Sequence, residues 1–400
     1  MPVPLLDVNA QNHPLTEKLR EAFDRVLASG QFIMGPDVLA FEQECAAMLE
    51  VKHAIACSSG TDALVMALMA LGIGPGDEVI LPSFTFFATA GSVARTGATP
   101  VFVDVCPICF NIDAEKAAAK ITSRTKAIMP VHLFGQSADM DAIQALADKH
   151  QLWVIEDCAQ AIGSLTKGKP CGTIGHYGAY SFFPSKNLGG FGDGGLLVTH
   201  DDALAEKARM MRNHGMQPKY FHSVVGGNFR MDTLQAALLR VKLAEYDSFT
   251  AGRQRNAAYY TEKFSELPGV IVADPAHCQC FTRQNDWLAE TNAKIILPVS
   301  YAHNTHIWNQ YTLRVIGEGQ RDALKAQLME KGIGCEVYYP LTMDQQECFA
   351  HLPDASRSDC EIAHRLATEV LSIPIYAELT QQQLDEVVRV ITSWIRGGPI

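Results

Sequence analysis

The chain lacks long apolar runs. No stretch of its 400 residues approaches the roughly 20 consecutive apolar residues that a membrane-spanning helix needs. The opening sequence, MPVPLLDVNA, has no basic segment followed by an apolar core, so we expect no signal peptide. These two absences predict a cytoplasmic protein without a membrane partner.

Positive charge is also scarce. The 33 Lys and Arg residues are outnumbered by 44 Asp and Glu residues, which gives a net charge of −11. Nucleic-acid surfaces need a concentrated basic patch, so this balance argues against a nucleic-acid partner. An anionic small ligand is still allowed, because local charge at a site can oppose the global charge. Internal repeats and low-complexity segments are absent.

Cysteine is present, but not in the paired motifs that zinc sites use. Cys106-Pro-Ile-Cys109 has redox-motif spacing and Cys278-Gln-Cys280 is a close pair, yet neither has a second pair at zinc-finger spacing. A thioredoxin-type pair opens a helix, whereas Cys106 follows the strand-like run Val101–Val105. We therefore expect reduced thiols and no metal site.

Short apolar runs alternate with segments of helical spacing between residues 53 and 200. The strand-like runs are Ala54–Cys57, Glu78–Pro82, Pro100–Val105, Ala127–His132, Leu152–Asp157, Gly178–Phe183 and Gly195–Thr199. The helical segments are Thr61–Leu71, Phe87–Thr96, Asp113–Ile121 and Met140–His150. This alternation predicts a three-layer α/β/α fold around a mixed, mostly parallel seven-stranded sheet. The last two runs are joined by a loop too short for a crossover helix, which favours an antiparallel edge strand.

A smaller α/β unit is expected to follow. The helical stretch Asp232–Thr261 leads out of the first unit, and the length of the chain suggests two domains, so we expect a large domain over 1–245, including an N-terminal arm, and a small domain over 246–400. Its expected strands are Trp308–Val315 and Cys335–Tyr339, and its expected helices are Gln320–Lys331, Asp359–Leu371 and Thr380–Ile395. Thr380 and Gln383 form a capping-box signature. The stretch 273–293 is expected to be an irregular insertion.

Lys186 lies between two of the apolar runs, in a glycine-rich loop that begins after Pro184. Ligands of such sheets bind beyond the carboxyl ends of the strands, where this loop begins. A lysine in an interior cleft loses solvation, which lowers the pKa of its amine and makes it a nucleophile toward carbonyl groups. The alternative is an exposed loop lysine, which is the usual environment of this residue.

Three other strand ends carry candidate groups. Ser59-Gly60-Thr61 opens a helix whose free amide groups can hold a phosphate, although it also serves as a plain helix start. Asp157 can pair with a protonated ring nitrogen or cap a helix, and Phe86 can stack on a flat ring or pack in the core. With the lysine, these are the parts that a pyridoxal phosphate site requires.

The chain resembles the DegT–StrS family of sugar aminotransferases, a branch of the fold type I pyridoxal phosphate enzymes. The resemblance runs nearly end to end and rests on SSGTDAL, PSFTFFAT, PVFVDV, HLFGQSADM, VIEDCAQAIG, SFFPSKNLG, DGG and GGNFRMDTLQAALLRVKL. It implies the aspartate aminotransferase fold and pyridoxal 5′-phosphate as cofactor, with pyridoxamine 5′-phosphate as an intermediate. It also implies a homodimer with composite active sites.

The resemblance assigns roles to individual residues. It implies that Lys186 and Asp157 are catalytic, since Lys186 forms the Schiff base with the cofactor and Asp157 pairs with the ring nitrogen. It places Gln160 near the phenolic oxygen and Phe86 on the ring. The remaining implied cofactor ligands are Ser59, Gly60, Thr61, Ser181 and, from the neighbouring subunit, Asn228. The candidate substrate contacts are Arg230, Tyr311 and Tyr338. Arg230 is expected to bind a substrate anion, or else to be an outward-facing residue at a helix start.

One segment departs from the family pattern. After Tyr338-Tyr339-Pro340 the family commonly has a Pro-Leu-His run that reaches toward the sugar, whereas this chain has Leu341-Thr-Met-Asp344. The histidine is missing, which leaves the sugar contacts of this loop open.

The resemblance implies transfer of an amino group from L-glutamate to a keto group of a nucleotide-linked sugar, which makes an amino sugar for a polysaccharide or a glycosylated metabolite. The segment Lys219–Arg230 resembles members that aminate C3 more than those that aminate C4. Lys186 argues against a related branch in which histidine replaces the lysine and the enzyme dehydrates a sugar. The alternatives are amination of a keto-cyclitol or an aminohydroxybenzoate precursor, and a regulatory relative without turnover.

Overall fold

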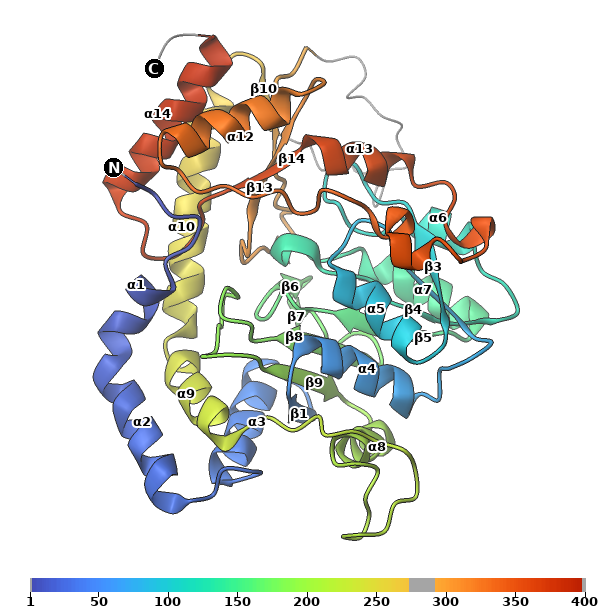
Figure 1. The fold of residues 1–400 in the computed structure, drawn as a ribbon. Coiled ribbons are helices and arrows are strands. Elements are labelled where there is room, and N and C mark those ends of the chain that lie inside the picture. Colours follow the sequence, from blue (N-terminus) through green and yellow to red (C-terminus); the bar gives the residue numbers. More distant parts are fainter. Residues whose placement is uncertain (1, 273–291, 398–400) are drawn as a thin grey trace.

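The computed structural model describes residues 2–272 and 292–397, and Figure 1 shows it in two stacked parts. The lower part surrounds a seven-stranded sheet and the upper part a four-stranded sheet. The long helix α10 (Tyr246–Ser265) runs along one side and joins them. Within the described ranges, no helix is both long enough and apolar enough to cross a membrane. Residues 273–291 of the expected insertion, with Cys278 and Cys280, lie outside these ranges.

The large sheet confirms the predicted α/β class. Its strand order is β1-β9-β8-β5-β4-β2-β3, and every neighbouring pair is parallel except the two that involve β9. The strands are β1 (His53–Cys57), β2 (Glu78–Pro82), β3 (Thr99–Val103), β4 (Thr125–Ile128), β5 (Trp153–Asp157), β8 (Tyr177–Ser181) and β9 (Gly195–Thr199). Each overlaps one of the apolar runs identified in the sequence.

The place of β9 differs from the expectation of an antiparallel edge strand. β9 is antiparallel to β8, as predicted, but it also pairs with β1 and so lies inside the sheet. β1 is the edge strand on that side. The orientation follows from the short loop between β8 and β9. The edge prediction was wrong because the pairing of β9 with β1 is a long-range contact that local spacing does not encode.

Helices cover both faces of the large sheet, as Figure 1 shows. On one face, Val79 and Leu81 of β2 share a core with α4 (Gly60–Ala70), α5 (Phe87–Arg95) and α8 (Asp202–Arg212). On the other face, Ile80 shares a core with α6 (Ala114–Ala119) and α7 (Met140–His150). Successive strand residues point to opposite faces, and all five residues of β2 are buried. This explains why the strands read as continuous apolar runs.

The edge formed by β1, β9 and β8 is covered by N-terminal helices and by α9. Ala54 and Leu196 share a third core with α3 (Pro36–Met48) and α9 (Thr233–Leu243). The other N-terminal helices are α1 (Val8–Asn12) and α2 (Thr16–Ser29). The first residues lie against the upper part instead, where Val3 pairs with Ile333.

The upper part contains the second sheet, in the order β10-β11-β13-β14. Its strands are β10 (Val270–Val272), β11 (Ile295–Leu297), β13 (Tyr311–Val315) and β14 (Val370–Ile373). Its helices are α12 (Gln320–Glu330), α13 (Glu361–Glu369) and α14 (Gln381–Arg396). The capping box of Thr380 and Gln383 is confirmed. The remaining short elements are η1 (His13–Leu15), η2 (Leu133–Gly135), β6 (Leu165–Thr166), β7 (Lys169–Pro170), β12 (Asn304–Thr305), η5 (Met343–Gln345), η6 (Glu347–Phe349) and η7 (Asp354–Ser356).

Three predicted boundaries in this part were wrong. The helical stretch 232–261 is two helices, because α9 ends at Leu243 and α10 begins at Tyr246. The strand expected at 335–339 is a single bridge between Glu336 and Ser372. The end of the helix expected at 359–371 is the strand β14, whose Val370 and Leu371 pair with β13. Tertiary pairing outweighed local helical spacing at that point.

The Cys106–Cys109 loop packs between the two parts. Cys106 and Cys109 are buried in a small apolar cluster with Ile296 and Tyr301. The Arg314 guanidinium donates a hydrogen bond of 2.6 Å to the backbone oxygen of Pro107. The loop therefore joins the large sheet to the small one.

Candidate active site

The carboxyl ends of β1, β8 and β5 lie side by side and bring the predicted residues together. Gly195, the first residue of β9, pairs with both Cys57 at the end of β1 and Ser181 at the end of β8. The pairing of Asp157 with Ala179 adds the end of β5. Strand ends that are adjacent in a parallel sheet form the usual ligand crevice.

The segment Ser59–Thr61 forms a cradle at the start of α4. The Ser59 hydroxyl caps the helix by accepting the Asp62 N–H across 3.1 Å. The N–H groups of Gly60 and Thr61 precede the Ala63 N–H, which donates to the Ser59 oxygen inside the helix, so they are available to an anion. A side chain at Gly60 would place its Cβ 2.8 Å from the Ser181 Cβ. Glycine is therefore required here for β8 to approach, which brings the Ser181 hydroxyl to the same cradle.

Lys186 has the electrostatic character expected of a nucleophilic amine. Its side chain is half-buried, and desolvation lowers the pKa of the amine to about 8. The nearby Asp157 carboxylate works in the opposite direction and raises that pKa. An amine with this pKa has a substantial uncharged fraction a little above neutral pH, and the uncharged form is the one that attacks an aldehyde.

Asp157 is a buried carboxylate with a defined geometry. Its Oδ2 accepts a hydrogen bond of 2.8 Å from the Thr89 hydroxyl, and its Oδ1 accepts one of 3.1 Å from the Ala159 N–H. Burial raises the pKa of Asp157, and these hydrogen bonds and the charge of Lys186 offset the rise only in part. The positive charge already near Asp157 therefore does not fully offset the cost of burying the carboxylate. A protonated pyridine nitrogen would add a further positive charge beside it, so the residues fit the predicted cofactor.

Gln160 is held by two hydrogen bonds. Its Oε1 accepts the Phe134 N–H across 2.7 Å, and its Nε2 donates to the Tyr339 hydroxyl across 3.2 Å. Tyr339 is therefore a site residue that reasoning from sequence missed. It comes from the segment after α12, and the only signal for it was its position in the Tyr338-Tyr339-Pro340 motif.

Phe86 lies at the start of α5 with an exposed ring. It immediately precedes α5, its side chain is 56% exposed, and its ring centroid lies 6.0 Å from that of Tyr339. An exposed aromatic residue at a strand end fits the stacking role better than the core-packing one. Tyr338 is half-buried beside Tyr339, with 5.8 Å between ring centroids, so it borders the same cleft.

Arg230 and Asn228 lie on the segment that crosses the end of β1. Arg230 pairs with Cys57 through its backbone, and its Nη1 donates to Asn213 Oδ1 across 2.7 Å. Its Nε is buried and has no protein acceptor among the described residues. The side chain of Asn228 is exposed, two residues before Arg230. Arg230 is thus a partly buried cation with a spare donor and is not an outward-facing residue.

The prediction that Tyr311 contacts substrate was wrong. Its side chain is fully buried in the core of the upper part, where its ring packs against Tyr260 and Trp308. Its hydroxyl forms a hydrogen bond of 2.8 Å with Thr261. Position in the strand β13 dictates this inward orientation, which the sequence pattern did not reveal.

Asp344, in the segment that departs from the family pattern, is turned away from solvent. Its Oδ2 accepts a hydrogen bond of 2.6 Å from His364 Nε2, and its Oδ1 accepts one from the Ser83 hydroxyl. Ser83 follows β2 and His364 belongs to α13, so Asp344 ties the lower part to the upper part. With 5% of its surface exposed, the Asp344 side chain offers no free group to a sugar.

Comparison with known proteins gives this site a family. Residues 14–392 match the DegT/DnrJ/EryC1/StrS aminotransferase family. A pleiotropic regulatory protein of Geobacillus stearothermophilus is 45% identical over 99% of this chain and 99% of its own. A UDP-N-acetyl-3-dehydro-alpha-D-glucosamine 3-aminotransferase of Acidithiobacillus ferrooxidans is 42% identical over 99% of this chain and 98% of its own.

Solved structures agree with the fold. Streptomyces venezuelae DesV, in complex with a ketimine intermediate, has a TM-score of 0.88 and 39% identity, with 98% of both chains covered. NtdA of Bacillus subtilis, with bound cofactor PMP, has a TM-score of 0.86 and 31% identity, covering 99% of this chain and 85% of its own. The three-layer fold predicted from the sequence is thus confirmed.

Proposed function

Because the chain belongs to the DegT/DnrJ/EryC1/StrS aminotransferase family, we propose that it transfers an amino group from L-glutamate to C3 of a nucleotide-linked keto sugar. The chain is a pyridoxal phosphate-dependent aminotransferase. The observation that carries the proposal is the convergence of Lys186, Asp157 and the Gly60 cradle at adjacent strand ends. The sugar nucleotide and the C3 position are supported by the 3-aminotransferase relative and by the segment Lys219–Arg230.

Lys186 carries the proton in this mechanism. Bound pyridoxal 5′-phosphate supplies an electron sink for the carbanion formed at the donor's alpha carbon. The amine of Lys186, whose pKa lies at about 8, would take the proton from that carbon and deliver it to the aldehyde carbon of the cofactor. In the second half-reaction the same amine would take a proton back from that carbon of the cofactor and deliver it to the former keto carbon of the sugar. A pKa close to the working pH suits both directions of transfer.

Asp157 and the cradle would fix the position of the bound cofactor. The Asp157 carboxylate, fixed by Thr89 and by the Ala159 N–H, would keep the ring nitrogen protonated. The Gly60 and Thr61 amides, with the Ser181 hydroxyl, would hold the phosphate. Phe86 would cover one face of the ring and exclude water from it.

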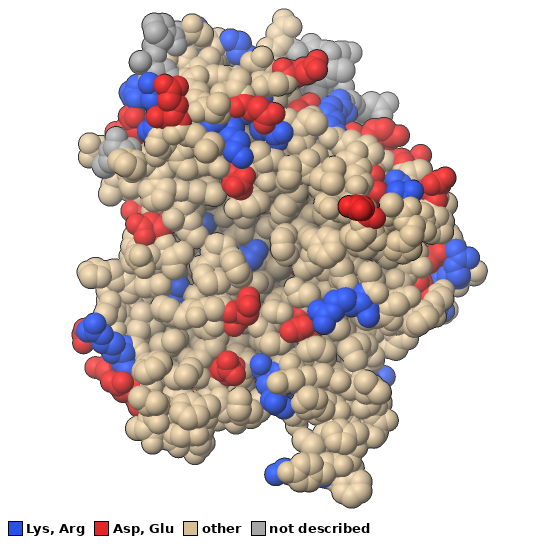
Figure 2. Space-filling view, viewed as in Figure 1, with Lys and Arg blue, Asp and Glu red and all other residues tan. Residues whose placement is uncertain are grey.

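Arg230 is the proposed contact for a substrate anion. Its guanidinium donates one hydrogen bond to Asn213, which fixes the orientation of the group. Its buried Nε has no protein acceptor among the described residues. The carboxylate of the amino-acid substrate or a phosphate of the nucleotide has paired oxygens that a guanidinium group binds through two parallel hydrogen bonds. Figure 2 shows Lys and Arg mixed with Asp and Glu on the face that it draws, so positive charge does not gather into one patch there.

A homodimer with composite active sites is part of the proposal. Phe32, Ile33 and Met34 are exposed apolar side chains, and this segment pairs with Asp232 and Thr233, just beyond Arg230. The loop before Asn228 exposes further large apolar side chains, namely Tyr220, Phe221 and Val225. Apolar patches of this kind usually mark protein interfaces. The exposed Asn228 would then reach the phosphate of the neighbouring subunit.

The second candidate is a regulatory protein without turnover. The relative named a pleiotropic regulatory protein favours it. A site that lowers the pKa of Lys186 and fixes Asp157 and Gln160 by hydrogen bonds favours catalysis instead. Amination of a keto-cyclitol or an aminohydroxybenzoate precursor would use the same cofactor residues and differ in the substrate loops.

Absorbance spectroscopy tests the proposal. The purified holoenzyme should show a visible cofactor band that L-glutamate bleaches, and a UDP- or dTDP-linked 3-keto sugar should restore it. Lys186→Ala should lower turnover by about a thousandfold, since general acid–base transfer contributes 10²–10⁴-fold. Lys167→Ala, at an exposed lysine paired with Asp141, is the matched control and should keep wild-type turnover. Cofactor binding without any response to glutamate would support the regulatory candidate.

A further inference from the structure

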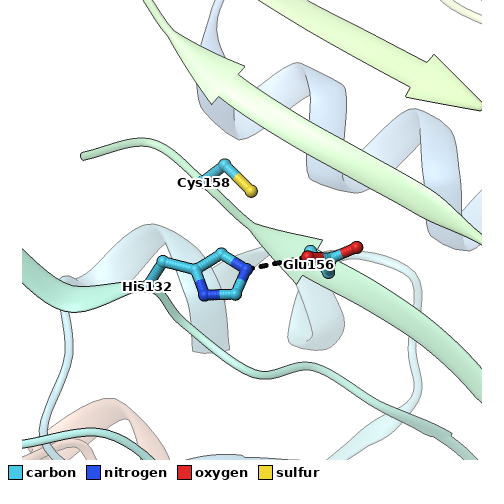
Figure 3. A group of neighbouring side chains, drawn as sticks. All are labelled: His132, Glu156 and Cys158. Carbon is cyan, nitrogen blue, oxygen red and sulfur yellow. Dashed lines mark hydrogen bonds and ion pairs between the residues drawn. The ribbon is translucent and has the colours of Figure 1, made fainter. Parts of the chain in front are cut away.

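A buried histidine and a buried glutamate lie directly behind the proposed cofactor site. Glu156 precedes Asp157 on β5, and neither it nor His132 exposes any surface. Their ligand atoms, together with the Cys158 sulfur, lie within 4.8 Å of one another, which is a spacing compatible with a metal ion. Figure 3 shows the imidazole pointing at Glu156, and a hydrogen bond joins these two residues alone.

The hydrogen bonds of Glu156 argue against a metal at this cluster. Its Oε2 accepts from His132 Nε2 at 2.8 Å and from the Gly172 N–H at 2.7 Å. Its Oε1 accepts from the N–H groups of Ile174 at 2.8 Å and Gly175 at 2.6 Å. Four donors converge on one carboxylate, so its acceptor sites are occupied. The cluster is therefore a hydrogen-bonded network.

The orientation of the His132 ring follows from its two partners. Its Nδ1 lies 3.0 Å from the Ala138 N–H, which can only donate, so Nδ1 is the acceptor and carries no proton. The ring proton is on Nε2, where it is donated to Glu156. The tautomer is thus assigned by the hydrogen-bond network. Both ring nitrogens are engaged, so the ring cannot flip without losing a bond.

His132 opens the turn that holds Gln160. The His132 N–H bonds the backbone oxygen of Asp157 at 3.0 Å. The next residues form a tight turn in which Phe134 has φ 59° and Gly135 has φ 97°. This unusual backbone aims the Phe134 N–H at Gln160 Oε1 across 2.7 Å. A shift of His132 would therefore move the donor that Gln160 depends on.

We propose that Glu156 and His132 are positioning residues that fix the orientation of the Gln160 amide. Because the Phe134 N–H engages Gln160 Oε1, the amide presents its NH₂ group to the cleft. With Gln160 beside the cofactor's phenolic oxygen, as the proposed function requires, the network makes Gln160 a hydrogen-bond donor to that oxygen. A donor beside an oxyanion stabilises its charged form.

The test combines cofactor binding with spectroscopy. Glu156→Gln places an NH₂ group against N–H donors. His132→Asn keeps an acceptor for the Ala138 N–H but loses the bond to Glu156. Both variants should weaken pyridoxal phosphate binding by the apoprotein about fivefold to tenfold. Both should also raise the pH of the transition in the visible band by roughly half to one unit, because a donor beside the phenolic oxygen is lost.

The controls separate positioning from general damage. His132→Gln keeps a donor near Glu156 and should recover part of the loss. His176→Asn is the matched control, since His176 Nδ1 also accepts a strand N–H, that of Val154, at the other end of β5. It should leave the transition pH unchanged. Gln160→Ala should shift the transition as Glu156→Gln does, and the double variant should shift it no further, because both act through one contact.

Three outcomes would overturn the proposal. The first is a folded Glu156→Gln variant with wild-type affinity and transition pH. The second is a double variant in which the two shifts add in full. The third is a ¹⁵N spectrum of the histidine rings in the apoprotein that places the His132 proton on Nδ1, a result that needs no cofactor. Failure of the proposed function itself would be distinct, because wild-type protein would then show no band that responds to glutamate.

Discussion

The Thr89 hydroxyl donates a hydrogen bond of 2.8 Å to Asp157 Oδ2, which ties the first turns of α5 to the end of β5. Thr89 is three residues beyond Phe86, so one helix start supplies both the proposed ring-stacking residue and a hydrogen-bond partner for the carboxylate. The spacing was visible in the segment PSFTFFAT, but only the fold brings Thr89 to Asp157.

Removal of this hydroxyl should impair the enzyme in a pH-dependent way. The Thr89 hydrogen bond lowers the pKa of Asp157, which burial raises. In Thr89→Val that pKa rises further, so the acid limb of the kcat/KM profile should move to higher pH. Activity near neutral pH should fall about tenfold, the value of one hydrogen bond to a charged group. Thr96→Val, whose hydroxyl bonds the Val93 oxygen in the same helix, should leave the acid limb in place.

Cofactor loading should follow the titration of Lys186. Desolvation lowers the pKa of its amine to about 8, and only the uncharged amine attacks an aldehyde. The rate of loading into the apoprotein should therefore rise with pH, with a midpoint at about pH 8. Asp157 raises the Lys186 pKa, so Asp157→Asn should move the midpoint to lower pH. Stopped-flow absorbance measures both, and a wild-type midpoint near that of an ordinary lysine would contradict the assignment.

Subunit mixing should reveal composite active sites. Lys186→Ala and Asn228→Asp homodimers should each be nearly inactive, the second because a carboxylate repels the cofactor phosphate. Unfolding and refolding the two together forms mixed dimers in which one site has both defects and the other has none. About a quarter of wild-type activity should return at equal mixing. No recovery from a mixture shown to contain mixed dimers would mean that Asn228 serves its own subunit.

The hydrogen bonds that Asp344 accepts from Ser83 and His364 should contribute to the free energy of unfolding. Asp344→Ala removes the acceptor of His364 Nε2 and leaves the fully buried Ser83 hydroxyl without it. An unsatisfied buried hydroxyl costs about 1–3 kcal/mol, so the free energy of unfolding should fall by about 2 kcal/mol in denaturant titrations. Asp354→Ala, at a side chain that is 99% exposed in its pair with Arg357, should change it by less than about 0.5 kcal/mol. Equal effects of the two variants would contradict a stabilising role of the Asp344 hydrogen bonds.

Much of the architecture could be predicted from the sequence. All seven strands of the large sheet overlap an apolar run, because a strand buried on both faces needs apolar residues at every position. The loop between β8 and β9 fixed the direction of β9 but left its partner β1 open. The end of the predicted helix 359–371 became β14, since pairing with β13 outweighed local spacing.

In the candidate site, too, some features could be predicted from the sequence and others could not. Asp157 ends a strand, and Lys186 and the Gly60 cradle each follow one, so the sequence by itself was enough to propose them as site residues. Only the tertiary structure buried Tyr311 in a core, turned Asp344 toward His364 and Ser83, and set Gln160 through Phe134. A short motif determines the geometry of residues that are close together in the sequence. Side-chain orientation depends instead on partners far along the chain, whose positions packing alone decides.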